Sequence, residues 1–140
     1  MRARKSAPLL ALACISGLLG GCSLFAGEPQ LETLSGQLTS ETTTSLPADA
    51  TIEVRLIEHG GDDTTLATTE LHHPGPFPID YQLRYDAAAL RTDHRYTLDA
   101  TIRVNTRVRY LNGDTVPLST EHDPGQPLDI PMVPVNRPDA

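Results

Sequence analysis

The alternation of apolar and polar residues in the second half of the chain constrains its fold more than any other feature. Every second residue is apolar across residues 77–85, and the same period recurs across residues 94–104. Because successive side chains of a strand point to opposite faces, this period is typical of strands with one buried face. Shorter alternating runs lie at residues 34–38, 52–56, 106–110 and 128–132. Turn residues separate the runs, so we predict an all-β fold, a single antiparallel β-sandwich of about seven to eight short strands.

Turn residues and prolines refine this prediction. Residues 112–114, Asn-Gly-Asp, are typical of a hairpin turn. Asp86 can cap the only helical candidate after the leader, the short turn at residues 87–91. The closing run contains Pro131 and Pro134, which cannot donate ladder hydrogen bonds. We therefore expect this run at a sheet edge or beside a bulge.

The alternation also predicts which side chains fill the core. In the longest run the inward set is Tyr96, Leu98, Ala100, Ile102 and Val104, and Thr101 belongs to the outward set. After Asn105 the pattern resumes, with Thr106, Val108 and Tyr110 expected inward. The aromatic residues Phe77, Tyr81, Tyr85, Tyr96 and Tyr110 fall on the same faces as aliphatic residues. We therefore interpret them as core rather than as a binding platform.

The first 22 residues have the composition of an export signal. Arg2, Arg4 and Lys5 precede an apolar run at residues 7–19, which is shorter than the roughly 20 residues that a membrane-spanning helix needs. Residues 19–22, Leu-Gly-Gly-Cys, then resemble the lipobox of a bacterial lipoprotein. At a lipobox a signal peptidase cuts before a cysteine, and that cysteine is then acylated.

The lipobox resemblance implies cleavage between Gly21 and Cys22, with diacylglycerol and palmitate carried by Cys22. Ser23 stands where an aspartate would resemble an inner-membrane retention signal, so we expect the outer membrane, with the domain facing the periplasm. An uncleaved anchor and an ordinary secretory signal are the alternatives. The predicted parts are a cleaved lipoprotein signal peptide at 1–21, a lipidated N-terminus and tether at 22–31, a β-sandwich domain at 32–135 and a frayed tail at 136–140.

The mature chain would be strongly acidic. Removing the three basic residues of the leader leaves eight basic against eighteen acidic residues, a net charge of −10 without any lysine. Such a chain is a poor candidate for binding nucleic acid or anionic lipid. Cys22 would be the only remaining cysteine, so no intrachain disulfide can form and the core must hold the fold.

Catalytic and metal-binding patterns are not found in the sequence. The five histidines show no ligand spacing with cysteine or carboxylates, and His72 and His73 are adjacent in an extended stretch that points them to opposite faces. No serine lies in a Gly-x-Ser-x-Gly motif, and no mature cysteine is free. We therefore expect a non-enzymatic protein without a cofactor or a bound metal.

Positive charge is concentrated in one short segment of the mature chain. Arg103, Arg107 and Arg109 lie close together in an otherwise acidic sequence. Two interpretations remain open. The arginines form a positive patch, or they pair across strands with Asp99, Asp80 or Glu53.

Several segments together resemble the YbaY family of bacterial lipoproteins, whose domain is shared with the YscW-type lipoprotein chaperones of type III secretion. The resemblance spans about residues 34–135. It implies an antiparallel β-sandwich on the outer membrane and, for the secretion-associated members, a pilot role that stabilises and localises a secretin. It implies no catalytic residues. The segments that carry it are residues 46–50, 76–79, 81–86, 94–102, 116–118 and 128–135.

The sequence therefore predicts a pilotin-like, non-enzymatic lipoprotein that binds or chaperones another envelope protein, with a secretin as one candidate. The alternative is a small-ligand-binding or hydrolytic lipoprotein whose site assembles only in the fold. For partner binding, we expect the first strand to offer an open edge at Leu34, Gly36, Gln37 and Leu38. This strand lacks proline and lies nearest to the tether.

Overall fold

Strands make up most of the structure, which is a computed structural model that describes residues 28–42, 45–72 and 74–135. Within this part the strands are β1 (Leu31–Thr39), β2 (Thr51–His59), β3 (Thr64–His72), β4 (Ile79–Asp86), β5 (Arg95–Val104), β6 (Arg107–Asn112), β7 (Val116–Leu118) and β8 (Ile130–Pro134). A single 3₁₀ turn, η1 (Ala87–Ala89), follows β4, and the Asp86 side chain caps it by accepting a hydrogen bond from Ala88 N. The all-β prediction and the predicted cap are confirmed.

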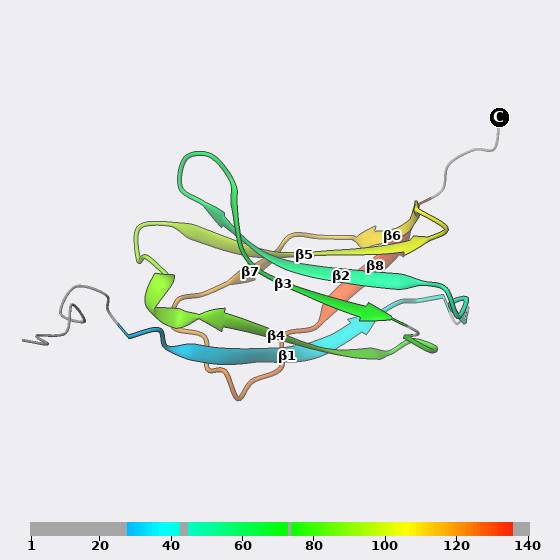
Figure 1. Ribbon diagram of the computed structural model, residues 1–140, viewed down its shortest axis with the longest axis horizontal. Coiled ribbons are helices and arrows are strands. Elements are labelled where there is room, and N and C mark those ends of the chain that lie inside the picture. Colours follow the sequence, from blue (N-terminus) through cyan, green and yellow to red (C-terminus); the bar gives the residue numbers. More distant parts are fainter. Residues whose placement is uncertain (1–27, 43–44, 73, 136–140) are drawn as a thin grey trace, which may run out of the picture.

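The strands form two layers that are joined into one curled sheet (Figure 1). The order is β3-β2-β5-β6-β8-β1-β4, and β7 pairs with β5 beyond the end of β6. All neighbours are antiparallel except β1 and β8, which run parallel. The outermost strands, β3 and β4, lie against each other without pairing, so the sheet is a nearly closed barrel. None of the described helical segments is long and apolar enough to cross a membrane.

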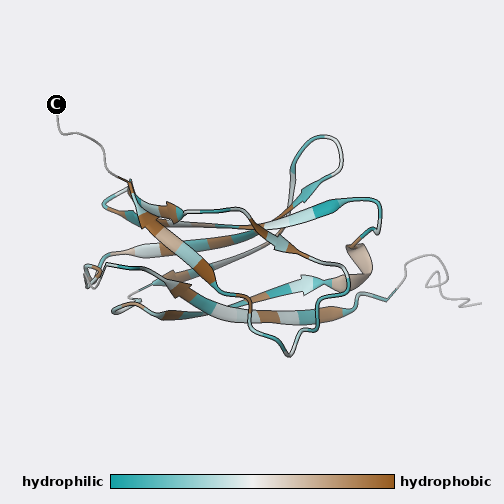
Figure 2. Cartoon of the chain, turned by 180° about the vertical axis from the view of Figure 1, so that it is seen from behind, coloured by the Kyte–Doolittle hydropathy of each residue, from teal (hydrophilic) through white to brown (hydrophobic). Residues whose placement is uncertain are grey.

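The core fills the space between the layers and follows the predicted alternation. Brown and teal residues alternate along the strands in Figure 2. Leu98 in β5 and Tyr81 in β4 are each only 1% exposed, and the predicted inward set of β5 is buried throughout. Thr101 departs from the prediction because it is also buried, between Glu53 and Leu111 on the two neighbouring strands. Phe77 is half-buried and packs its ring edge-on against Tyr110, with ring centroids 5.3 Å apart.

The C-terminal segment closes the barrel against β1 at a glycine. Leu128 N donates a hydrogen bond to the Ser35 carbonyl over 2.9 Å, and the Tyr81 hydroxyl donates to the Leu128 carbonyl. A Cβ atom on Gly36 would lie 2.1 Å from the Leu128 carbonyl oxygen, so only glycine permits this approach. Burial raises the pKa of Tyr81, which keeps its hydroxyl available as a donor.

The expected edge position of the closing strand is wrong, because β8 lies between β6 and β1. Pro131 pairs with β1 beyond the last β6 partner, Asn112. Val135 N donates to the Arg109 carbonyl of β6 over 2.8 Å, so the nitrogen of Pro134, one residue earlier, points away from β6. On that other side of Pro134 there is no strand, because β1 ends at Thr39, opposite Pro131. The Pro131 carbonyl accepts from Gly113 N over 2.9 Å, just past the end of β6, so the Pro131 nitrogen also lies on the β6 side. Neither proline nitrogen therefore faces a residue of a paired strand.

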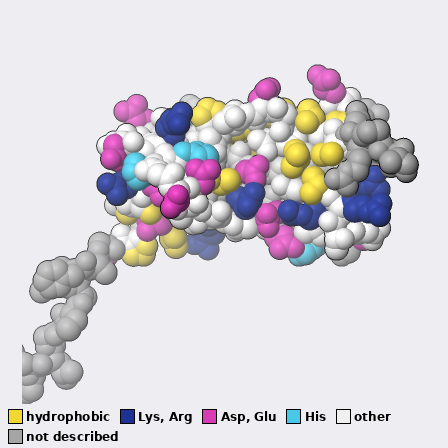
Figure 3. Space-filling view, turned by 90° about the horizontal axis from the view of Figure 1, so that it is seen from above, with side chains coloured by type: hydrophobic (Ala, Val, Ile, Leu, Met, Phe, Trp, Pro, Cys, Tyr) yellow, Lys and Arg dark blue, Asp and Glu magenta, His cyan; other side chains and the backbone are white. Residues whose placement is uncertain are grey.

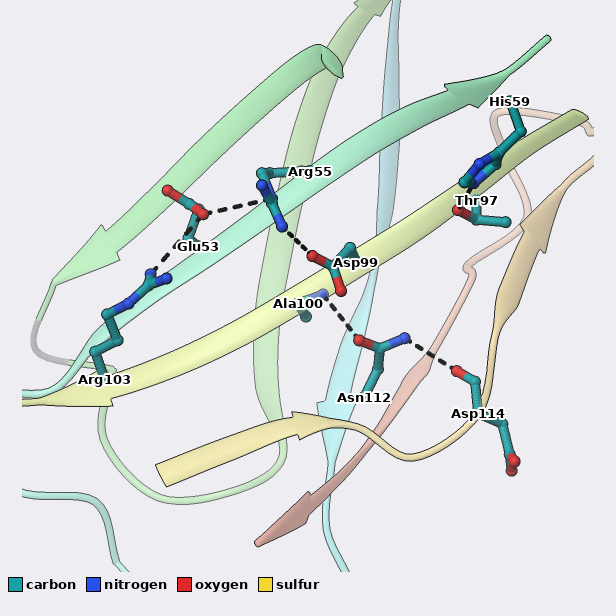
Figure 4. Close-up of polar contacts among 9 residues, drawn as sticks. All are labelled: Glu53, Arg55, His59, Thr97, Asp99, Ala100, Arg103, Asn112 and Asp114. Atoms are coloured by element: carbon teal, nitrogen blue, oxygen red, sulfur yellow. Dashed lines mark hydrogen bonds and ion pairs between the residues drawn. The ribbon is translucent and has the colours of Figure 1, made fainter. Parts of the chain in front are cut away.

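The predicted hairpin at residues 112–114 is also wrong. The strands on either side of it, β6 and β7, both pair with β5 and not with each other. The Asn112 side chain bridges the break, accepting from Ala100 N over 3.4 Å and donating to the Asp114 carbonyl over 3.0 Å (Figure 4). The true hairpin turn is Asn105-Thr106, with φ values of 50° and 66°, a left-handed conformation that asparagine adopts more readily than most residues.

Candidate partner-binding surface

The sequence-predicted site residues do not form a site in the described structure. Gly21 and Cys22 lie outside the described residues. The predicted open edge of β1 is wrong, because β1 is paired with β4 on one side and meets β8 on the other. The Gln37 backbone N–H is already bonded to the Asp129 carboxylate over 2.9 Å, and the Gln37 side chain donates to Asp80. Leu34 and Leu38 are completely buried, and Gly36 lies under Leu128.

Exposed apolar side chains gather instead on the outer face of β6 and β8. The structure has five exposed large hydrophobic side chains among its described residues, and four belong to this face. Their exposed fractions lie between 37% and 46%. The fifth is Leu31, at the start of β1. The four residues, which we call the β6–β8 face, are Val108, Leu111, Val133 and Val135.

A shift in strand register brings Val108 onto this face. The register of β5 and β6 slips between Ile102 and Arg103, so Tyr110 pairs with inward-facing Ile102 whereas Val108 pairs with outward-facing Arg103. The prediction that Val108 points inward is therefore wrong. Leu111 pairs with Val133 across β6 and β8, which places their side chains next to each other on the same outer face.

The three arginines of the sequence cluster differ in their pairing. Arg103 lies 3.9 Å from the Glu53 carboxylate, so its cross-strand pairing is confirmed (Figure 4). Asp99 pairs with Arg55 instead. Arg107 and Arg109 have no carboxylate within ion-pair distance in the described part of the chain. Figure 3 shows hydrophobic side chains and arginines gathered at this end of the molecule.

A hollow of about 350 Å³ adjoins the β6–β8 face. The segment before β2 supplies Leu46 and Pro47, and the two strands supply Tyr110, Arg109 and Val135. Arg109 thus borders both the apolar face and the hollow, and its carbonyl holds Val135 in place. The surface is therefore apolar, with the cationic Arg109 at its border.

The opposite end of the barrel holds a larger pocket of about 620 Å³. Its histidines are already engaged. His59 contacts Asp63 through Nδ1 and Thr97 through Nε2, each over 2.8 Å. His94 Nδ1 donates to the Glu58 carboxylate over 2.6 Å.

The Glu58 carboxylate at this end joins several elements. It accepts from His94 and also from the Tyr96 hydroxyl, which itself accepts from Arg91 N over 2.6 Å. The hydrogen bond from His94 is the main reason that the pKa of Glu58 lies below its ordinary value. This network ties β2 and β5 to the loop after β4, so its polar groups serve the fold.

The described residues do not supply a metal centre. They contain no group of three or more His, Cys, Asp or Glu side chains that could hold an ion. Their buried side-chain nitrogen and oxygen atoms all have hydrogen-bond partners.

Comparison with known proteins first defines the class of fold. The chain is similar to a solved structure described as an alternative pilotin from the type II secretion system of Vibrio cholerae. The TM-score is 0.69 at 20% sequence identity, and the match covers 77% of this chain and 100% of that one. At this identity the likeness shows a shared fold.

The family is shown by the sequence itself. The model of the family described as "Type III secretion system lipoprotein chaperone (YscW)" matches residues 29–129, which is more than half of the chain. The chain therefore belongs to this family, and the resemblance found in the sequence is confirmed. No curated protein sequence matches the chain.

Proposed function

We propose that this protein is an outer-membrane lipoprotein that binds and chaperones another envelope protein in the manner of a pilotin, with a secretin as the partner class. The observation that carries the proposal is the β6–β8 face, an exposed apolar surface with Arg109 at its border. Large contiguous apolar patches on a domain surface often mark binding sites for other proteins. Membership of a family of secretion lipoprotein chaperones supports the same function.

In this proposal Cys22 carries the lipid anchor, and the face works at a distance from it. The chain enters the domain at Leu31, at the opposite end of the barrel from the β6–β8 face (Figure 1). The Gln30 carbonyl accepts from Ala87 N over 2.8 Å, which fixes this entry point beside η1. A domain tethered from this end to the inner leaflet of the outer membrane would present its apolar face toward the periplasm.

The proposed protein is not an enzyme. The larger pocket has the volume that a small ligand needs. However, its histidines bond to Asp63, Thr97 and Glu58, and the Ser119 hydroxyl accepts from Glu121 N. Side chains held in this way support the fold and do not converge on a substrate, which favours partner binding over the ligand-binding or hydrolytic alternative.

The anchor is tested with Cys22→Ser in cells fed a palmitate analogue. We expect the wild-type protein to be labelled and to fractionate with the outer membrane, and Cys22→Ser to be unlabelled. Stable anchoring needs more than one acyl chain, so an unlipidated chain would be lost from the membrane. Cys14→Ser, in the same leader, is the matched control and should be labelled normally. Labelling that persists in Cys22→Ser would refute the anchor.

The chaperone function is tested by identifying the envelope protein that the anchored protein binds. We expect affinity purification from crosslinked envelopes to recover one envelope protein, and deletion of the gene to reduce the assembly of that protein in the outer membrane. Recovery of no envelope protein from crosslinked wild-type cells, together with normal assembly in the deletion strain, would contradict the proposed function.

A further inference from the structure

We infer that Asn112 is a deamidation site that the fold holds closed, so that it reacts only when β8 separates from β6. Residues 112–113 are the only place in the sequence where an asparagine precedes a glycine. The sequence pattern predicted a hairpin turn here, whereas the structure uses the pair to join β6, β7 and β8. The inference concerns the chemistry of the chain itself and does not depend on the proposed function.

The reaction is intramolecular until its last step, which needs only water. The Gly113 backbone nitrogen attacks Cγ of the Asn112 side chain and forms an N–Cγ bond. The Cγ–Nδ2 bond breaks, and Nδ2 leaves as ammonia with the proton that Gly113 loses. Water then opens the five-membered succinimide at one of its two carbonyl carbons, which gives aspartate or isoaspartate. Glycine after the asparagine favours the attack because it has no Cβ to obstruct the approach.

The folded structure holds the two reacting groups apart. Gly113 N donates to the Pro131 carbonyl of β8 over 2.9 Å. Asn112 Oδ1 accepts from Ala100 N of β5 over 3.4 Å (Figure 4). Because β5 and β8 lie on opposite sides of β6, the attacking nitrogen and the carboxamide are bonded to different neighbours. Attack therefore requires these hydrogen bonds to break.

The leaving group and the glycine are also held. Asn112 Nδ2 donates to the Asp114 carbonyl over 3.0 Å, and Asn112 pairs with Met132 across β6 and β8. The Val133 side chain covers Gly113, since a Cβ atom there would lie 2.8 Å from Val133 Cγ1. Separation of β8 from β6 would release all the contacts that Gly113 makes with β8. Such a local opening costs less free energy than global unfolding.

Neither product can restore the join. An aspartate carboxylate has no N–H group, so it cannot donate to the Asp114 carbonyl as Nδ2 does. In isoaspartate the main chain runs through the side-chain carbon and is one atom longer. That extra atom would lie between the residue that pairs with Met132 and the nitrogen that bonds to Pro131, so both contacts cannot keep their present register. We therefore expect a modified chain to open more easily than the original.

The test follows the reaction in the full chain as cells produce it, purified in mild detergent. The protein is incubated in mildly alkaline water labelled with heavy oxygen, with and without urea. Peptide mass spectrometry measures label uptake at residue 112, and enzymatic methylation measures isoaspartate. We expect deamidation at Asn112 to be at least about tenfold faster in urea. Asn105 is the internal control, because the β-branched Thr106 after it obstructs the attack and should slow deamidation even in urea.

Two core variants separate opening of β8 from global unfolding. Met132→Ala weakens β8, whereas Leu83→Ala weakens the distant β4, and both residues are buried. Compared at equal global stability, which is set with urea, Met132→Ala should deamidate at Asn112 at least about threefold faster than Leu83→Ala.

A third variant mimics the aspartate product. Asn112→Asp should lower the melting temperature, because the donor to Asp114 is lost. Asn105→Asp makes the same change in charge at an exposed turn and should melt with the wild type.

Three results would overturn the inference. Equal deamidation rates with and without urea would show that the fold gives Asn112 no protection. Equal acceleration by Met132→Ala and Leu83→Ala would show that global unfolding, and not separation of β8, exposes the site. An Asn112→Asp chain that melts with the wild type would show that the Asn112 side chain does not hold the join.

Discussion

The two ends of the barrel differ in how many of their named side chains have bonding partners within the fold. At the end where the tether enters, Glu58, His94 and Tyr96 bond to one another, and His59 bonds to Thr97. At the far end, Arg107 and Arg109 have no ion-pair partner in the described part of the chain, and four aliphatic side chains face solvent. At the first end these side chains therefore hold the fold together. The second end has left both charge and apolar surface available.

This difference shows why pocket volume is a poor guide to function in this domain. The pocket at the tether end is the larger of the two, at about 620 Å³ against about 350 Å³. Its histidines already have partners, so a ligand that used them would have to break existing hydrogen bonds, each of which contributes roughly 0.5–1.5 kcal/mol. The smaller hollow adjoins Arg109, which has no ion-pair partner in the described residues. A partner that binds there would therefore break no ion pair of the fold.

The largest expected difference in stability is between two leucine-to-alanine substitutions, one at a core position and one on the β6–β8 face. Leu98 is 1% exposed and Leu111 is 40% exposed. Leu98→Ala should destabilise the domain by about 2–5 kcal/mol, because it leaves a cavity. Leu111→Ala should change stability by about 0.5 kcal/mol or less. Urea unfolding of both variants measures this, and an equally large cost for Leu111→Ala would make the face part of the core.

A smaller loss is expected at the closure of the barrel. Gly36→Ala should destabilise the domain by about 1–3 kcal/mol, because the new Cβ would collide with the Leu128 backbone. Gly125→Ala is the control, since the nearest atoms there belong only to the Asp123 side chain. Thermal unfolding of the two variants should separate them clearly. Equal melting temperatures would show that residues 126–130 do not pack on β1 as described.

The polar end should also give a characteristic dependence on pH. The pKa of Glu58 is lowered from 4.5, chiefly by the hydrogen bond from His94. Its stabilising contribution is therefore complete above that value and is lost as pH falls through the lower pKa of the folded state. Glu58→Gln should remove this part of the acid dependence, whereas Glu121→Gln, an exposed carboxylate, controls for the change in charge. Melting temperatures between about pH 3 and 7 that fall in parallel for wild type and Glu58→Gln would contradict the role of Glu58.

The smallest effects on stability should come from replacing two arginines, one that forms ion pairs and one that does not. Arg55 contacts both Asp99 and Glu53, so Arg55→Met should cost up to about 1 kcal/mol. Arg107→Met should leave stability unchanged within about 0.5 kcal/mol. Urea unfolding at low and high salt measures the difference, which should shrink as salt screens the pairs. A larger loss for Arg107→Met would mean that Arg107 serves the fold.

The strands could be predicted from the sequence because their alternation is a local property. The inward set of β5, the strand of residues 79–86 and the cap at Asp86 were all encoded within a few neighbouring residues. The position of β8 could not be predicted in this way. It depends on which distant strands accept the segment, and the two prolines were compatible with an interior position only because each half of β8 meets a different neighbour.

Only part of the candidate site could be predicted from the sequence. The cluster of Arg103, Arg107 and Arg109 in an acidic chain was a usable signal. The exposure of Val108 was not, because a shift of one residue in register moves a side chain to the other face and the alternation does not report a bulge. The expected edge at β1 failed for a related reason, since an edge is defined by strands that lie far away in the sequence.

The central claim is that this protein holds its partner at the β6–β8 face, and photocrosslinking in cells tests it most directly. A photoreactive phenylalanine analogue would replace Val133 on the face or Gln82, an exposed residue of β4 in the other layer. We predict a crosslink to one envelope protein from position 133 and none from position 82. The crosslink should weaken when Arg109→Glu, at the border of the face, is added. A crosslink to the same protein from position 82 but not from position 133 would contradict the account.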